Sequence, residues 1–159
     1  MGAAHGAPFE AVVSAGGDVG ISLRPAHYAE LLEAPPAVGF IQLRSEDFFD
    51  AAGVNANALR GDAQAVLERV RAHYPVSLLG TGLALGSVAG PDPAYLDRLV
   101  RLVERVEPAR VADQAGFARG SQLPAYTEAA LARRVSQLIQ VQERLRRPLL
   151  VENVWSLVA

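Results

Sequence analysis

The chain has 159 residues, half of them apolar and a fifth charged, which is ordinary for a globular protein and enough for one domain with a buried core. The formal net charge of -2 gives no electrostatic basis for binding nucleic acid or an anionic membrane, and no apolar run is long enough to span a bilayer. Without any cysteine, the chain has no disulfide, thiolate metal site or cysteine nucleophile.

The first residues lack the basic start and the long apolar stretch of a secretory signal peptide. We therefore expect residues 1–17 to form a flexible leader and residues 18–159 to form one domain. We also expect a cytoplasmic protein.

The remainder of the chain alternates between short apolar runs and amphipathic stretches. The apolar runs predict strands within residues 18–23, 37–49, 76–86, 109–117 and 149–158. The amphipathic stretches predict helices over residues 26–34, 57–73, 93–106 and 128–147. Asp92 and Thr127 stand where N-caps of the last two helices are expected. A proline or a polar turn marks almost every boundary.

This βαβα order predicts a parallel sheet with right-handed crossovers, and the near-continuous apolar strands indicate that both faces are covered. Two architectures fit the order, an open doubly wound sheet and part of a (β/α) barrel. A closed eight-stranded barrel needs about 250 residues, so this chain has room for roughly five units.

The stretch VSLLGTGLALGS, residues 76–87, carries three glycines after the third predicted strand. A dinucleotide-binding turn requires G-x-G-x-x-G directly before a helix. Here the last spacing is one residue too long, and the next helix begins only near Pro93. We therefore interpret the stretch as a strand exit whose glycines let neighbouring backbone pack closely.

Acidic and amide side chains gather at the ends of three predicted strands. They are Glu46, Asp47, Asp113, Glu152 and Asn153. Because the carboxyl ends of parallel strands share one rim, carboxylates from these strands are predicted to converge there, as ligands of a hard cation or as an acid and a base. The alternative is structural, with the same groups capping helices or pairing with arginines such as Arg44 and Arg119.

The three histidines lie away from this rim. His5 falls in the leader, His27 in the first turn of a predicted helix and His73 in the last turn of another. No H-x-H or H-E-x-x-H pairing occurs, so the histidines do not predict an imidazole metal site.

The segment GISLRPAHYAELLE, residues 20–33, resembles the opening of the multinuclear non-heme iron enzymes related to the methanobactin-biosynthesis oxidase. The likeness continues in order through FIQLRSEDFF, YPVSLLGTGLALGS, LVERVEPARVADQAGF and PAYTEAALARRVSQLIQVQERLRRPLLVEN. It implies a xylose-isomerase-like TIM barrel. We thus expect an α/β fold, a partial (β/α) barrel of about five parallel strands alternating with helices. It also implies two or three iron ions at the rim, and oxidation by molecular oxygen of a cysteine in a ribosomally made peptide that a partner protein delivers.

The sequence departs from the family pattern at three positions where that pattern has histidine. Arg44, Leu79 and Gln114 occupy these positions. The histidine–aspartate loop before P-Y-T is also contracted, to ARGSQLPAYT. Iron in such sites takes imidazole and carboxylate ligands together, so we expect that the implied iron is not retained.

Some of the family's polar positions do match. Glu46, Glu152 and Asn153 match directly, while Asp113 is one methylene shorter than the family's glutamate. We assign Glu46, Asp113 and Glu152 as residual metal positions. We assign Asp47 and Asn153 as candidate substrate-binding residues.

These observations lead to the expectation of a truncated, non-catalytic relative of the iron oxidases that acts as a binding or interaction module. One alternative is a divergent metal-dependent oxidoreductase of ribosomally made peptides that uses carboxylates alone. Another is a chain without separate activity. Because a partial barrel leaves two sheet edges unpaired, we expect a homo-oligomer or a barrel-completing chain as partner, beside a precursor peptide and its partner protein. We expect neither nucleic acid nor a membrane as partner.

Overall fold

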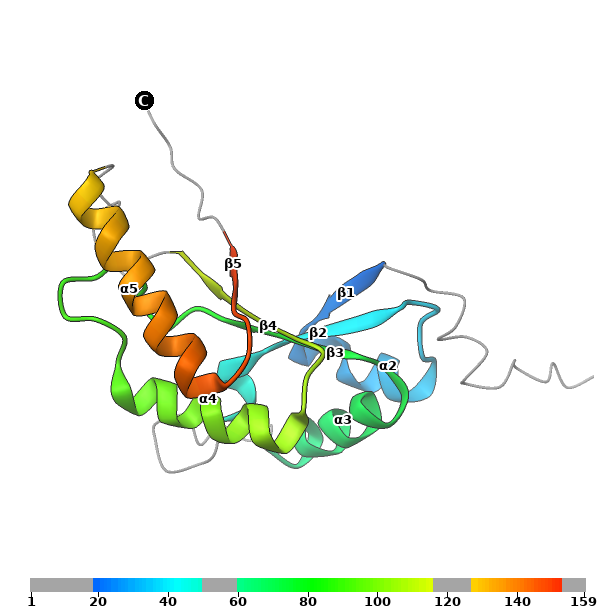
Figure 1. The fold of residues 1–159 in the computed structure, drawn as a ribbon. Coiled ribbons are helices and arrows are strands. Elements are labelled where there is room, and N and C mark those ends of the chain that lie inside the picture. Colours follow the sequence, from blue (N-terminus) through cyan, green and yellow to red (C-terminus); the bar gives the residue numbers. More distant parts are fainter. Residues whose placement is uncertain (1–18, 50–59, 116–126, 153–159) are drawn as a thin grey trace, which may run out of the picture. The chain divides into compact units, whose positions relative to one another are not determined.

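The computed structural model describes residues 19–49, 60–115 and 127–152 (Figure 1). The predicted leader lies outside these residues, as does Asn153 with the second half of the last predicted strand. The chain divides into two compact units, Met1–Ser77 and Leu78–Ala159. The expectation of one domain over residues 18–159 stays a prediction.

Five parallel strands alternate with helices, which confirms the predicted fold class. The strands are β1 (Gly20–Leu23), β2 (Phe40–Arg44), β3 (Val76–Gly80), β4 (Arg110–Gln114) and β5 (Leu150–Glu152). Their order in the sheet is β1-β2-β3-β4-β5. In a doubly wound sheet the strand order reverses at a switch point, whereas in a (β/α) barrel each strand lies next to the one before it. The sequential order is therefore that of a partial barrel.

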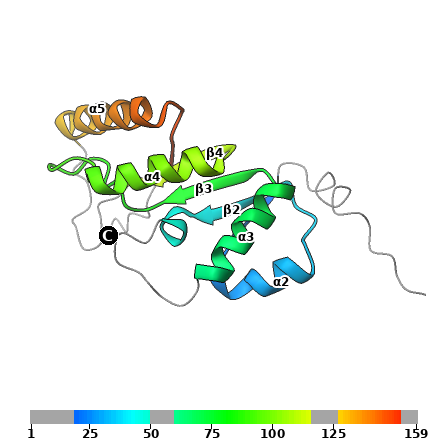
Figure 2. The same cartoon turned by 90° about the horizontal axis from the view of Figure 1, so that it is seen from below.

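The first unit combines β1 and β2 with helical segments. Its helices are η1 (Pro25–His27), α2 (Tyr28–Glu33), η2 (Ser45–Phe48) and α3 (Arg60–His73). In β2, Ile41 and Leu43 are fully buried while the alternate residues are more exposed, as expected for a strand covered by helices on one side. The α2 and α3 helices lie side by side (Figure 2). The hydroxyl of buried Tyr74 donates a hydrogen bond of 2.8 Å to the carbonyl of Pro36, which fastens the end of α3 to the turn after α2.

The second unit carries α4 (Pro93–Val106) and α5 (Glu128–Leu145) beside β4 and β5. Both predicted N-caps are confirmed. The Asp92 carboxylate accepts a hydrogen bond from the Ala94 amide at 3.0 Å, and the Thr127 hydroxyl accepts one from the Ala130 amide at 3.2 Å. Each cap satisfies an amide that has no partner within its helix.

One predicted helix face differs in the structure. The apolar spacing predicts that α5 points Leu131, Val135, Leu138 and Val141 inward. Val141 is buried as predicted and Leu138 is half-buried, but Leu131 and Val135 are exposed. The face of α5 that is buried instead carries Gln137, Val141 and Leu145. The polar Gln137 is on the buried face, where its side chain hydrogen-bonds to the loop between β3 and α4.

Candidate functional site

The glycines after β3 are explained by two side chains of the second unit. A Cβ atom at Gly80 would collide with the Asp113 carboxylate and the Tyr95 hydroxyl, and one at Gly82 would fall on the Tyr95 ring. Tyr95 comes from the first turn of α4 and is buried, and its hydroxyl donates to Asp113 Oδ2 at 3.4 Å. The glycines thus make room for a buried tyrosine–aspartate contact, where the sequence predicted close backbone packing.

Asp113 lies on the side of the sheet that the helices cover. It is completely buried, and it accepts a hydrogen bond from Tyr95 of α4. In the parallel pairing of β4 with β5, its partner is Val151, whereas Gln114 is the partner of Glu152. Because successive strand residues point to opposite faces, Asp113 and Glu152 lie on opposite sides of the sheet. The structure therefore does not bring these two predicted metal ligands together.

The opposite side of the sheet carries Leu79, Gln114 and Glu152, which we name the Gln114 face. The Gln114 amide donates to Glu152 Oε2 at 3.2 Å, so these two side chains share that side. Gly80 faces Tyr95 and Asp113. Because successive strand residues point to opposite sides of the sheet, the neighbouring Leu79 lies on the same side as Gln114 and Glu152. All three residues stand at or next to the carboxyl ends of their strands, which is the rim where (β/α) barrels hold their sites.

The loop between β3 and α4 is fixed to α5 by a single buried side chain. Gln137 accepts a hydrogen bond of 2.6 Å from the Gly86 amide and donates one of 2.8 Å to the Ser87 carbonyl. Gly86 has φ +96, and a Cβ there would press on the Arg134 guanidinium. Gln137 of α5 thus holds Gly86 in a left-handed backbone conformation that residues other than glycine rarely adopt.

The first unit places its own acidic residues just after β2. Arg44 and Glu46 form an ion pair of 3.3 Å that is open to solvent. Burial raises the pKa of the Asp47 carboxyl above its ordinary value. The positive charge of Arg44 lowers this pKa in part, and the negative charge of Glu46 raises it. Burial also raises the pKa of Tyr28 to about 12, and the nearby Asp47 charge adds to the rise. Glu46 is therefore engaged by Arg44.

The described residues do not contain a group of three or more histidine, cysteine, aspartate or glutamate side chains that could hold a metal ion. The ligand types on the Gln114 face explain this for the second unit. That face offers a hydrocarbon, an amide and one carboxylate, and iron in such sites takes imidazole with carboxylate. These residues do not fit the iron centre that the resemblance implies. The assignment of Glu46, Asp113 and Glu152 as metal positions stays a prediction, as do the roles of Asp47 and Asn153.

Two residues that organise the rim were not found from the sequence. Tyr95 and Gln137 sit on helices, and their partners are 18 and 51 residues away in the chain. For Gln137, one signal was present, because a glutamine interrupts the apolar spacing of α5 beside Leu138 and Val141. No local pattern points to Tyr95.

Comparison with known proteins identifies the family. Residues 18–159 match the profile of the RiPP precursor modification enzyme MbnB/TglH/ChrH family. The chain belongs to this family. This confirms the resemblance to iron enzymes related to the methanobactin-biosynthesis oxidase.

Relatives of the family give the extent of the match. A UPF0276 protein of Chromobacterium violaceum is 39% identical over 149 residues, which cover 89% of this chain and 51% of that protein. A UPF0276 protein of Psychromonas ingrahamii is 35% identical, over 86% of this chain and 48% of that protein. The chain thus spans about half the length of these relatives.

A solved structure of L-ribulose 3-epimerase is also similar, with a TM-score of 0.49 and 18% identity, over 82% of this chain and 48% of that one. Within the described residues, no helix is both long and apolar enough to cross a membrane.

Proposed function

We propose that this chain is a non-catalytic member of its family, a cytoplasmic binding or interaction module that does not oxidise a peptide through iron of its own. The observation that supports the proposal is the composition of the Gln114 face. Its residues stand at the strand ends where the resemblance implies metal ligands, yet Leu79 cannot coordinate a metal and Gln114 offers only an amide.

The geometry of the remaining carboxylate supports the same proposal. One oxygen of Glu152 already accepts a hydrogen bond from Gln114, and Asp113 is buried on the other side of the sheet. The Gln114 amide and the Glu152 carboxylate have oxygens that can accept hydrogen bonds from a peptide, and Leu79 can make apolar contact with it. This combination suits an extended peptide better than it suits a cation. A ribosomally made peptide is therefore the ligand class we propose for this face.

The proposal is tested by restoring ligands one position at a time. Leu79→His alone is expected to bind no iron, since position 114 still lacks a ligand. Leu79→His combined with Gln114→His adds Glu152 as a third ligand, completing a two-histidine, one-carboxylate set, and is expected to bind Fe(II). Iron is measured per chain after anaerobic loading and desalting. Binding by the single variant as strong as that of the double variant would show that the ligand assignment is wrong.

A second candidate is a metal-dependent oxidoreductase that uses carboxylates alone, and one observation favours it. Glu152 keeps an exposed carboxylate at the rim, and a hard ion such as Mn²⁺ or Mg²⁺ takes oxygen ligands. If this candidate holds, Mn²⁺ raises the melting temperature and Glu152→Gln abolishes the rise. Our proposal predicts no shift in either protein.

A further inference from the structure

The positive charge of Arg134, in the first half of α5, has no counter-charge within the part of the chain that the structure describes. Its guanidinium lies against the backbone of Gly86, with Nε 3.0 Å and Nη2 3.2 Å from the point where a Cβ of that glycine would be. Nε is buried and has no hydrogen-bond partner, and among the described residues no ion pair joins Arg134 to an acidic side chain. The loop between β3 and α4 thus shields one edge of this cation from water.

The sequence around Arg134 supplies no carboxylate either. On a helix, side chains three and four positions apart are neighbours. The residues at these positions are uncharged: Ala130, Leu131, Gln137 and Leu138. The loop that Arg134 touches, residues 81–91, also has no acidic residue. A cation that is partly removed from water and lacks a counter-charge favours the approach of an anion.

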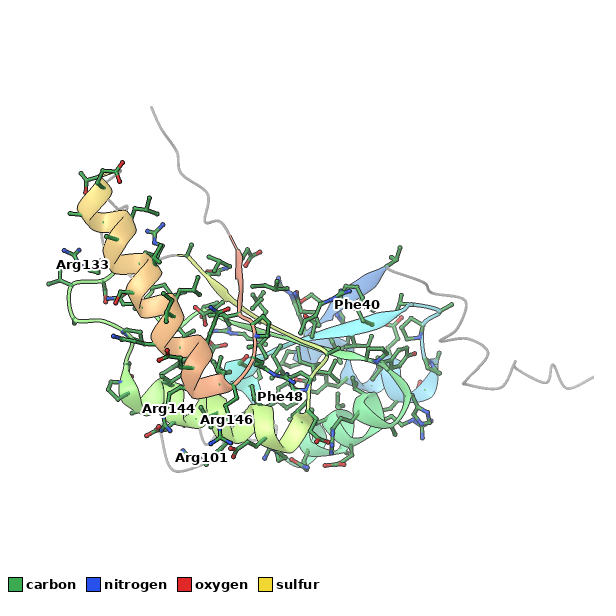
Figure 3. The ribbon with its side chains drawn as sticks, in the orientation of Figure 1. Phe40, Phe48, Arg101, Arg133, Arg144 and Arg146 are labelled. Atoms are coloured by element: carbon green, nitrogen blue, oxygen red, sulfur yellow. The ribbon has the colours of Figure 1, made fainter. Side chains whose placement is uncertain are left out.

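The arginines at the other end of α5 have structural roles that account for them. Figure 3 shows Arg144 at the end of the helix opposite to Arg133. Arg144 reaches Asp97 of α4 at 2.6 Å, and Arg147 donates a hydrogen bond of 2.6 Å to the carbonyl of Pro108. These contacts fasten α5 to α4 and to the turn after it. Arg134 has no comparable contact with a charged or carbonyl partner among the described residues.

The surroundings of Arg134 hold its guanidinium in place. Gln137, one turn further along α5, bonds the Gly86 amide and the Ser87 carbonyl, so the loop is fixed to the same helix face. The Arg134 side chain is half-buried with Nε shielded by the loop, and its Nη groups remain open to a ligand. A planar guanidinium can donate two parallel hydrogen bonds to a carboxylate, and a fixed one loses little freedom on doing so.

Arg134 lies at the same end of the second unit as the Gln114 face. The loop leaves the carboxyl end of β3, and α5 follows the carboxyl end of β4. We propose that Arg134 is a specificity-determining residue that binds a carboxylate of a peptide held at this rim. The carboxylate comes from an acidic side chain or from the C-terminus of the peptide. This inference rests on the proposed peptide ligand and adds the chemical group that the chain selects in it.

The first experiment tests carboxylate binding without any peptide. The Nε–H signal of Arg134 is followed by NMR in the whole chain and is assigned by its loss in Arg134→Gln. N-acetylglutamate amide offers a side-chain carboxylate, N-acetylglutamine offers a terminal one, and N-acetylglutamine amide offers neither. We expect a saturable shift with one or both carboxylates, at constant ionic strength, and none with the neutral probe. No saturable shift with either carboxylate would overturn the proposal.

The neighbouring Arg133 provides a control of equal charge. It is exposed on the same helix, so Arg133→Gln lowers the net charge as Arg134→Gln does. The Arg134 signal is expected to titrate in Arg133→Gln as it does in the wild type. Loss of the shift in Arg133→Gln would show that the probes respond to the general charge of α5, which also overturns the proposal.

The second experiment uses a soluble library of random peptides with free C-termini, passed over the immobilised chain. Retained peptides are expected to be enriched in Asp or Glu, or to lose binding when their C-terminus is amidated. Arg134→Gln is expected to bind them at least about tenfold more weakly, and Arg133→Gln to bind them as the wild type does. Arg134→Lys keeps the charge without the planar fork, so we expect intermediate binding. Amide exchange at Gly86 checks that the loop stays in place in each variant.

The outcomes separate this inference from the proposed function. Peptides that bind Arg134→Gln as tightly as the wild type would overturn the role of Arg134 and leave the peptide ligand standing. If the wild type retains no peptide, the proposed peptide ligand is wrong, and the role of Arg134 in selecting it fails with it.

Discussion

At the scale of single residues, the position of a side chain at a strand end does not determine which side of the sheet it faces. Asp113 follows the pattern of a metal ligand at a strand end, but the side chain points to Tyr95 under the helices. The sequence could not reveal this, because a shift of one residue along a strand changes the side of the sheet. From the sequence, Gln114 is noted only because the resemblance implies a histidine at its position. In the structure, the Gln114 amide donates a hydrogen bond to Glu152.

The contact of Tyr95 with the two glycines leads to a stability prediction. Gly82→Ala places a methyl group on the Tyr95 ring, so it is expected to lower the free energy of unfolding by about 2 kcal/mol. Gly90→Ala is the control, since a Cβ there has room and costs about 1 kcal/mol through its φ of +80 alone. Urea denaturation measures both, and equal losses would contradict the packing described for Tyr95.

The raised pKa of Tyr28 predicts how stability changes at high pH. Well below pH 10.0 the phenol is protonated in both states, and as the pH rises toward about 12 the unfolded chain loses this proton before the folded chain does. The free energy of unfolding is thus expected to fall across this range more steeply for the wild type than for Tyr28→Phe. Denaturation at several pH values tests this, and parallel pH profiles of the two proteins would refute it.

The charge of Asp47 contributes to the same titration. Asp47→Asn removes a negative charge near the phenol, so the pKa of Tyr28 is expected to move down while remaining above its ordinary value because of burial. Absorbance of tyrosinate at 295 nm, compared with Tyr28→Phe to isolate this residue, follows the change. An unchanged or higher pKa would be inconsistent with the placement of Asp47.

At the scale of elements, the sequence predicts most boundaries and misses one orientation. All five strands and four longer helices occur where apolar spacing, prolines and the caps Asp92 and Thr127 place them. These signals are local, so they can be read without the tertiary structure. The buried face of α5 depends on a loop about 50 residues earlier, and periodicity alone therefore selected Leu131 and Val135 wrongly.

The link between α5 and the rim loop can be broken by one substitution. Gln137→Ala removes two hydrogen bonds and leaves the Gly86 amide without its acceptor, so it is expected to lower the free energy of unfolding by about 2 kcal/mol. Amide exchange at Gly86 is expected to become faster. Gln140→Ala, at an exposed position of the same helix, should change neither quantity. Unaltered exchange at Gly86 would rule out this role for Gln137.

At the scale of the whole molecule, the family and the fold class follow from the sequence, while the state of the site does not. Strand order and helix alternation are repeated along the chain and tolerate substitutions, so they remain recognisable. Chemistry at the rim depends on a few side chains from separate strands. Our proposal is that Leu79 and Gln114, which occupy two of these strand-end positions, change what the rim can bind.

The central claim is that this chain has lost the ligands for the iron chemistry of its family. The most direct test is to load the purified wild-type chain anaerobically with Fe(II), remove unbound metal and measure iron by elemental analysis. Our account predicts less than about a tenth of an equivalent per chain, with no change in Glu152→Gln. One or more equivalents of iron in the wild type, lost in Glu152→Gln, would contradict it.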